Sequence, residues 1–218
     1  MIRRRTSLVA LLPLCVVTLS ACFTGERPEL MIDDTIPPLS DQAASAVIDT
    51  LESGFASPFT VTYTVTTRYG GLVAQAAVSH DPELGTSVNI AEVRYLTQPD
   101  GTTRTCSTIT GDCVLGIDET RVSNRQLTSS IFTTSTAERI RQDLKVAVAD
   151  SASTSVDRAG RQATCVAIPV VDSSGSRREK SYCVFPDLNV VASLDTADLL
   201  IEPVSVADSA DAALFIAD

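Results

Sequence analysis

The 218-residue sequence contains one histidine and no tryptophan, and aromatic residues make up only 5% of it. A single histidine excludes metal sites built from several imidazoles. The sequence also contains neither a GxSxG nucleophile elbow nor a GxxxxGK[ST] phosphate loop, and the pair Gly70–Gly71 is typical of a hairpin turn. The one histidine, His80, lies in the stretch SHDP beside a turn proline, so we interpret it as a surface-turn residue rather than a general base. We therefore expect no catalytic residue, no cofactor and no metal ligand, and we predict a protein that is not an enzyme.

Positive charge is also scarce, because 17 basic residues stand against 27 acidic ones. Loss of residues 1–21 would remove three arginines and no acid, which leaves 14 basic residues and a net charge of −13. Nucleic acids and bacterial membranes are both anionic, so long-range attraction to either is disfavoured. We expect no nucleic-acid partner, and any attachment to a membrane must have another cause.

The N-terminal segment has the layout of a secretory leader. Three arginines, Arg3 to Arg5, precede an apolar run over residues 8–19, and small residues follow. The run ends in a lipobox formed by Leu19, Ser20, Ala21 and Cys22. We expect cleavage between Ala21 and Cys22 and a diacylglyceryl group on the thiol of Cys22. Two buried acyl chains give stable anchoring, whereas one gives marginal binding.

Two other interpretations of this leader are weaker. The apolar run has 12 residues and contains Pro13, whereas a membrane-spanning helix needs about 20. An ordinary signal peptide has no need of a cysteine at the first mature position. The consecutive arginines are compatible with either general or twin-arginine export.

Three regions follow from this pattern: a signal peptide over residues 1–21, a lipidated cysteine and tether over 22–39, and one domain over 40–218. The tether is acidic and contains Pro28, Pro37 and Pro38. Its residues 23–38 span roughly 50 Å when fully extended. The acidic pair Asp33 and Asp34 within it is interpreted as solvated charge.

The cysteines support an oxidising compartment. Cys15 would leave with the leader and Cys22 would carry lipid, so an even number remains: Cys106, Cys113, Cys165 and Cys183. The turn DSSGS centres a hairpin on Ser174, with one cysteine nine positions away on each side. We predict disulfides between Cys165 and Cys183 and, by the same symmetry, between Cys106 and Cys113. Zinc or redox chemistry is the alternative, but no CxxC spacing occurs.

Periodicity predicts two helices. The first begins at the N-cap Ser40 and ends at Gly54; its buried positions are Ala44, Val47, Ile48 and Leu51. The second begins with a capping box, in which Ser135 caps the start and Glu138 reaches back. Its apolar face is expected to hold Ile140, Leu144, Ala147 and Val148, and its solvent face Arg139, Arg141, Gln142, Asp143 and Lys145. This helix either packs on the sheet or forms a lid over a cavity.

Alternating residues and turn signals predict the strands. A first meander of about five strands covers 59–66, 72–79, 87–97, 102–108 and 113–117, and a second set covers 153–157, 161–171, 177–185, 190–194 and 199–206. Successive hairpins imply an antiparallel sheet. The basic cluster of Arg177, Arg178 and Lys180 is interpreted as a strand's solvent face, with a lipid phosphate as its alternative partner. The end of the chain, 208–218, is a short acidic tail.

The order of these elements over residues 40–206 resembles that of the LolA/LppX-type carriers, which are envelope proteins. The resemblance is architectural, and no short motif transfers a binding residue. It implies an α+β fold with a curved, open antiparallel sheet, an incomplete barrel, and two main helices over one face. It also implies an apolar cavity between sheet and helices that takes acyl chains.

These observations lead to an expected function and one alternative. We expect a lipoprotein anchored through Cys22 on the extracytoplasmic face of the cell membrane, where it binds or carries a lipid or other apolar ligand. The alternative is a non-catalytic interaction or sensor module that binds another envelope protein and no small ligand.

Overall fold

In the part of the chain that the computed structural model describes, residues 41–122, 127–172 and 174–216, eleven strands form one antiparallel sheet. The lipobox, Cys22 and the tether lie outside these residues. The strand order is β6-β5-β4-β3-β2-β1-β11-β10-β9-β8-β7, so β6 and β7 are the two edges and the sheet is open. The strands are β1 (Phe59–Thr67), β2 (Leu72–Asp81), β3 (Gly85–Ile90), β4 (Val93–Thr97), β5 (Thr103–Ser107), β6 (Cys113–Leu115), β7 (Ala152–Arg158), β8 (Arg161–Val171), β9 (Arg177–Phe185), β10 (Val190–Asp195) and β11 (Leu199–Ala207).

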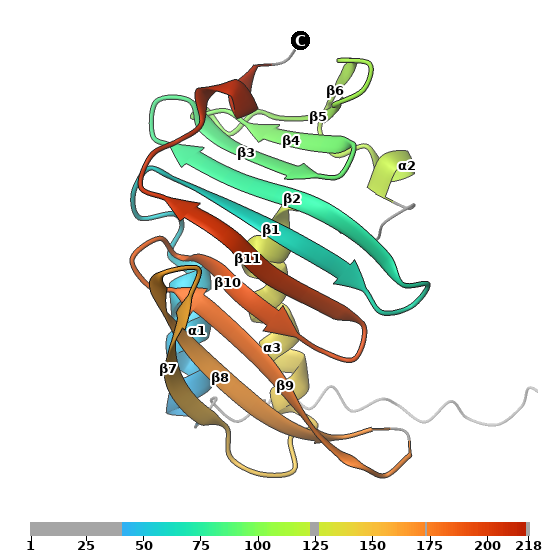
Figure 1. Ribbon diagram of the computed structural model, residues 1–218, viewed down its shortest axis with the longest axis vertical. Helices are drawn as coiled ribbons and strands as arrows, with labels where there is room; N and C mark the ends of the chain where they lie inside the picture. The colour runs from blue at the N-terminus through green and yellow to red at the C-terminus, as the bar shows by residue number, and fades with distance from the viewer. Residues whose placement is uncertain (1–40, 123–126, 173, 217–218) are drawn as a thin grey trace, which may run out of the picture. The chain divides into compact units, whose positions relative to one another are not determined.

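Helices cover one face of this sheet (Figure 1). They are α1 (Gln42–Glu52) and α3 (Thr134–Leu144), with a 3₁₀ turn, η1 (Ser129–Phe132), directly before α3. A short helix, α2 (Glu119–Val122), follows β6, and a second 3₁₀ turn, η2 (Ala212–Phe215), lies near the end of the chain. The predicted α+β class, the open antiparallel sheet and the two main helices on one face are therefore confirmed. No helix in the described ranges is long and apolar enough to cross a membrane.

The first meander contains one strand more than predicted. Residues 87–97 do not form a single strand, because a two-residue turn at Ala91 and Glu92 separates β3 from β4 and pairs Ile90 with Val93. Ala91 adopts a positive φ of 52°, a conformation usually supplied by glycine or asparagine. The sequence has neither residue at this turn, so the pattern of the sequence does not predict a break between β3 and β4.

Both helices begin differently from the prediction. The N-cap of α1 is Asp41, whose carboxylate accepts a hydrogen bond from the Ala44 amide at 3.0 Å; Ser40 lies outside the described residues. The capping box of α3 is wrong, because Thr133 occupies the N-cap position without a side-chain hydrogen bond. The hydroxyl of Ser135 instead bonds to that of Ser130 at 2.6 Å. Ser135 is therefore the second residue of α3, bonded to η1, and does not cap the helix.

The core fills the space between helices and sheet. The four predicted positions of α1 are buried, at 2% exposure or less. Tyr63 of β1 is fully buried, lies 4.8 Å from the ring of Phe132 and donates a hydrogen bond to the Val191 carbonyl at 2.7 Å. Under the other half of the sheet, the Tyr95 hydroxyl donates to the Leu127 carbonyl at 3.1 Å. Segment 127–132 therefore closes the sheet face beside α3.

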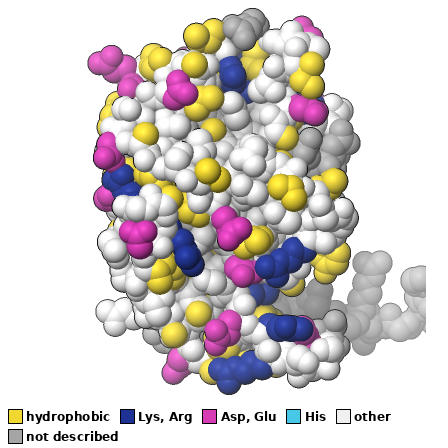
Figure 2. All heavy atoms as spheres, viewed as in Figure 1, with side chains coloured by type: hydrophobic (Ala, Val, Ile, Leu, Met, Phe, Trp, Pro, Cys, Tyr) yellow, Lys and Arg dark blue, Asp and Glu magenta, His cyan; other side chains and the backbone are white. Residues whose placement is uncertain are grey.

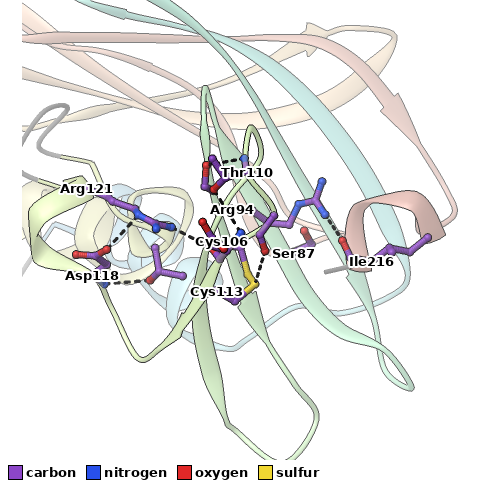
Figure 3. The surroundings of a disulfide bond; sticks show 12 residues. Ser87, Arg94, Cys106, Thr110, Cys113, Asp118, Arg121 and Ile216 are labelled. Carbon is purple, nitrogen blue, oxygen red and sulfur yellow. Dashed lines mark hydrogen bonds and ion pairs between the residues drawn. A yellow bond between two sulfur atoms is a disulfide. The ribbon is translucent and has the colours of Figure 1, made fainter. Parts of the chain in front are cut away.

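The structure places both predicted cysteine pairs at disulfide distance. The sulfur atoms of Cys106 and Cys113 are 2.00 Å apart, and those of Cys165 and Cys183 are 1.99 Å apart. Each pair joins directly opposed residues of neighbouring strands, β5 with β6 and β8 with β9. The first pair ties down the short edge strand β6 (Figure 3).

His80 does not lie in a surface turn. It belongs to β2, is partly buried beside Phe55 with ring centroids 5.0 Å apart, and its Nδ1 is 3.0 Å from the Thr86 hydroxyl. The turn begins one residue later, where the Asp81 carboxylate accepts from the Glu83 amide. Burial lowers the pKa of His80, and the nearby carboxylate of Asp81 only partly offsets this.

This histidine predicts an acid-sensitive stability. Because the pKa of His80 is lower in the folded protein than the usual value of about 6.5, protonation favours the unfolded chain. The stability that neutral His80 contributes is fully present above about pH 6.5, and it is lost as the pH falls through the pKa of His80 in the folded protein. We expect the free energy of unfolding, measured by urea titration, to decline between pH 7 and 5. His80→Gln should abolish that decline, and a decline unchanged in the variant would contradict the assignment.

Candidate functional site

A groove of about 450 Å³ opens along one side of α3, between this helix and the sheet. Its floor contains three buried side chains, Leu127, Ile131 and Tyr182, each at most 7% exposed. Its walls carry polar and charged groups from α3 and β9. The full lining is Leu127, Thr128, Ile131, Ser135, Glu138, Arg139, Gln142, Asp143, Lys180 and Tyr182.

The inner end of the groove holds a buried ionic network. Asp143 is 8% exposed; one of its carboxylate oxygens lies 2.6 Å from Lys180 Nζ and the other accepts a hydrogen bond from the Tyr182 hydroxyl. Burial raises the pKa of Tyr182 far above its usual value, and the bond to Asp143 raises it further, so this phenol stays a donor. Both carboxylate oxygens thus have partners, which a buried charge requires.

A second ion pair involves Arg139, another residue that lines the groove. Arg139 lies one turn before Asp143 on α3, and its guanidinium is 2.9 Å from the Asp198 carboxylate in the β10–β11 turn. The Thr196 hydroxyl donates to the same aspartate at 2.8 Å. The main chain of Asp198 also accepts from the Arg68 amide at 2.8 Å. The β1–β2 and β10–β11 hairpins are therefore joined next to α3.

The chemistry of this groove differs from that of an acyl-chain cavity. Two cationic and two anionic side chains line it, and the carboxylate of Glu138 and the amide of Gln142 are exposed at its mouth. Such walls suit polar backbone and charged side chains of a bound segment, whereas an acyl chain would cover the exposed carboxylate of Glu138 and the amide of Gln142 without offering them a hydrogen-bond partner. Between the sheet and the helices, where the family resemblance implies an apolar cavity, the side chains of Tyr63, Phe132 and Ile140 are buried.

Two interpretations of charged residues need correction. Asp143 was placed on the solvent face of its helix, but it points into the fold. The basic cluster is also divided: Lys180 is paired with Asp143 inside the groove, while Arg178 pairs with Asp172 at 3.1 Å near the β8–β9 turn. Arg177 is exposed. These three side chains therefore do not form one continuous solvent face.

Three further residues predicted for the apolar face of this helix lie differently from the prediction. Helix α3 ends at Leu144, so Val148 is exposed rather than on the apolar face, and Leu144 and Ala147 are only partly buried against the core. The sequence does contain an indication that Asp143 is buried, because it lies three residues after Ile140, on the same side of the helix. Tyr182 gave no such signal, since its role depends on β9 passing beneath α3.

No group of three or more histidine, cysteine, aspartate or glutamate side chains among the described residues is arranged to hold a metal ion. Among the lining residues, Glu138 and Gln142 are exposed and not buried in the ionic network, so they are the groups able to engage a ligand in the groove. Their chemistry permits binding through ion pairs and hydrogen bonds.

Comparisons with known proteins give structural likenesses alone. No protein-family model matches the sequence, and no curated protein matches it. The crystal structure of MucB aligns with a TM-score of 0.46 at 16% identity, over 80% of this chain and 62% of that chain. The Pseudomonas aeruginosa MucA/MucB complex aligns with a TM-score of 0.45 at 15% identity, over 81% and 61%. A LolA superfamily protein from Nitrosomonas europaea aligns with a TM-score of 0.34 at 10% identity, over 77% and 94%.

The chain thus spans about three fifths of the length of the MucB chains that it matches. With every TM-score below 0.5, these likenesses assign neither a family nor a function to this chain.

Proposed function

We propose that this protein is a non-enzymatic binding module of the cell envelope and that a segment of another protein binds in the groove beside α3. The observation that carries the proposal is the contrast between a packed interior and a charged, open groove. Side chains of the helix-facing core such as Val47, Tyr63 and Phe132 are fully buried, so the described core leaves no room for an acyl chain beside them. The groove, in contrast, presents exposed Glu138 and Gln142 above a floor of buried side chains.

The proposed location follows from the leader. Cys22 would carry the acyl anchor, and the tether would let the domain reach partners up to roughly 50 Å from the membrane surface. Metabolic labelling with palmitate tests this part. Label should enter the wild-type chain and be lost in Cys22→Ala, and label retained in that variant would contradict the anchor.

A charge reversal at the groove mouth tests the protein-partner proposal. We expect Glu138→Lys to reduce recovery of a stoichiometric partner, cross-linked in intact cells and quantified by mass spectrometry, by about tenfold, as for loss of one interface charge pair. Glu202→Lys is the matched control, because Glu202 is an exposed acid on β11 away from the groove.

A photo-reactive residue at Gln142 distinguishes the two functions. Transfer of the cross-link to one polypeptide supports the protein partner. Transfer to lipid would instead support the lipid carrier, in which α3 must move away from the sheet to admit an acyl chain.

A further inference from the structure

The C-terminal segment, residues 208–216, does not extend freely as an acidic tail. It crosses the face of the sheet opposite to α1 and α3, where η2 lies against β3 (Figure 1). The segment forms no strand of the sheet. What holds it is a set of side chains that project from β1 to β4.

Four of those side chains lie in one cross-strand row, which we name the outer row: Thr60, Ser79, Ser87 and Leu96. Register pairs each with the next, from β1 to β4. Ser79 and Ser87 are fully buried and Leu96 is 8% exposed, although all three point away from the main core. Buried hydroxyl groups need hydrogen-bond partners. The Ser79 hydroxyl donates to the Phe59 carbonyl within the sheet at 3.2 Å, and the C-terminal segment supplies further partners.

The hydrogen bonds reach main-chain atoms of that segment. The hydroxyl of Ser87 donates to the Leu214 carbonyl at 2.6 Å, and the hydroxyl of Thr60 donates to the Ser209 carbonyl at 2.9 Å. The Asp211 amide donates to the hydroxyl oxygens of Thr60 at 2.9 Å and Ser79 at 3.1 Å.

Arg94 of β4 completes the set by donating to the Ile216 carbonyl, beside Ser87 (Figure 3). Contacts to carbonyls and amides recognise the main chain of this segment, which includes the 3₁₀ turn η2, rather than a particular side chain.

The bound segment itself is held lightly. Most of its residues are exposed, and only Leu214 and Phe215 among its large apolar side chains are partly buried. At the first residue of the segment, Asp208 forms an ion pair with Arg161, and the Asp208 side chain is 84% exposed. Exposed pairs of this kind contribute little to stability. The row is therefore more completely buried than the segment that covers it.

From this geometry we infer that the outer row is a binding site for a peptide segment that includes a 3₁₀ turn, and that residues 208–216 occupy it as an intramolecular ligand. The partner that fits is a segment of another polypeptide with free main-chain carbonyls and a leucine–aromatic pair, in place of Leu214 and Phe215. Such a partner would displace the chain's own C-terminus. This site lies on the opposite face of the sheet from the groove and does not depend on the function proposed for it.

Competition with a labelled peptide of residues 208–216, DSADAALFI, tests the inference on the full-length protein. A tethered segment competes at a high effective concentration, so the wild-type chain should bind the free peptide weakly. The double variant Leu214→Ser with Phe215→Ser should bind it at least ~10-fold more tightly by fluorescence anisotropy. Adding Ser87→Ala to that variant should weaken binding about fivefold, as for loss of one hydrogen bond. Ser155→Ala, on the distant strand β7, is the control and should change nothing.

A second variant guards against misfolding of the first. Asp211→Pro keeps both apolar residues but removes the amide that Thr60 and Ser79 bind. It should also expose the site and raise the affinity for the peptide. The inference is overturned if neither variant binds the peptide more tightly than the wild type does. It is also overturned if Ser87→Ala leaves the binding unchanged.

Discussion

Replacement of Phe132 by alanine is expected to lower the free energy of unfolding by about 4 kcal/mol, the usual cost of emptying a buried aromatic site. Phe132 is fully buried, belongs to η1 and lies 4.8 Å from the ring of Tyr63. Its side chain therefore helps to fill the space between the sheet and the helices. The loss can be measured by urea denaturation at pH 7.5. Ile109→Ala, at a residue that is 71% exposed, is the control and should stay within ~0.5 kcal/mol of the wild type.

The same variant should acquire a property that the wild type lacks. An apolar cavity left by a large side chain stays dry and takes small apolar molecules. We expect benzene to raise the melting temperature of Phe132→Ala and to leave that of the wild type unchanged. Equal stabilisation of both proteins would show that the wild-type core already contains an open apolar space.

Removal of Asp143 has the second large expected effect. Asp143→Ala leaves Lys180 and the Tyr182 hydroxyl without the carboxylate that both contact, and breaking a buried pair costs about 4 kcal/mol. Urea denaturation measures this loss. Asp150→Ala is the matched control, because Asp150 is an exposed acid shortly after the same helix, and it should be nearly neutral.

Replacing both charges separates the ionic contribution from packing. Asp143→Leu combined with Lys180→Met removes the buried charges and retains apolar volume. Such replacements of a complete buried pair are often close to neutral. The double variant should therefore recover part of the stability lost in Asp143→Ala, while the Tyr182 hydroxyl still lacks the acceptor that Asp143 provided. A double variant as unstable as the single one would contradict the role assigned to the ion pair.

Local patterns predicted the framework of this fold well. The alternation of valine and tyrosine with threonine in 59–66 reports a strand with one dry face, and β1 has that burial pattern. The cysteine pairs could also be predicted from the sequence, because the symmetry of each hairpin places the two cysteines opposite one another. Both signals depend on residues close in sequence.

The candidate site could not be predicted from the sequence in the same way. Asp143, Lys180 and Tyr182 meet only because α3 crosses β9, and helical periodicity assigns a charged residue to solvent unless a partner is known. The sequence also left open whether the space between the sheet and the helices is filled. Architecture alone distinguishes neither a cavity from a core nor a lid from a packed helix, and Phe132 lies in a short turn for which no structure was predicted.

We propose that the sheet and its helices enclose a packed core and that the protein binds a protein segment rather than carrying lipid. Native mass spectrometry of the full-length chain, purified from its own envelope, tests this most directly. The account predicts the mass of the polypeptide with its covalent anchor and no further lipid, whether or not a partner polypeptide is retained. One non-covalent lipid bound per chain in stoichiometric amount would contradict it.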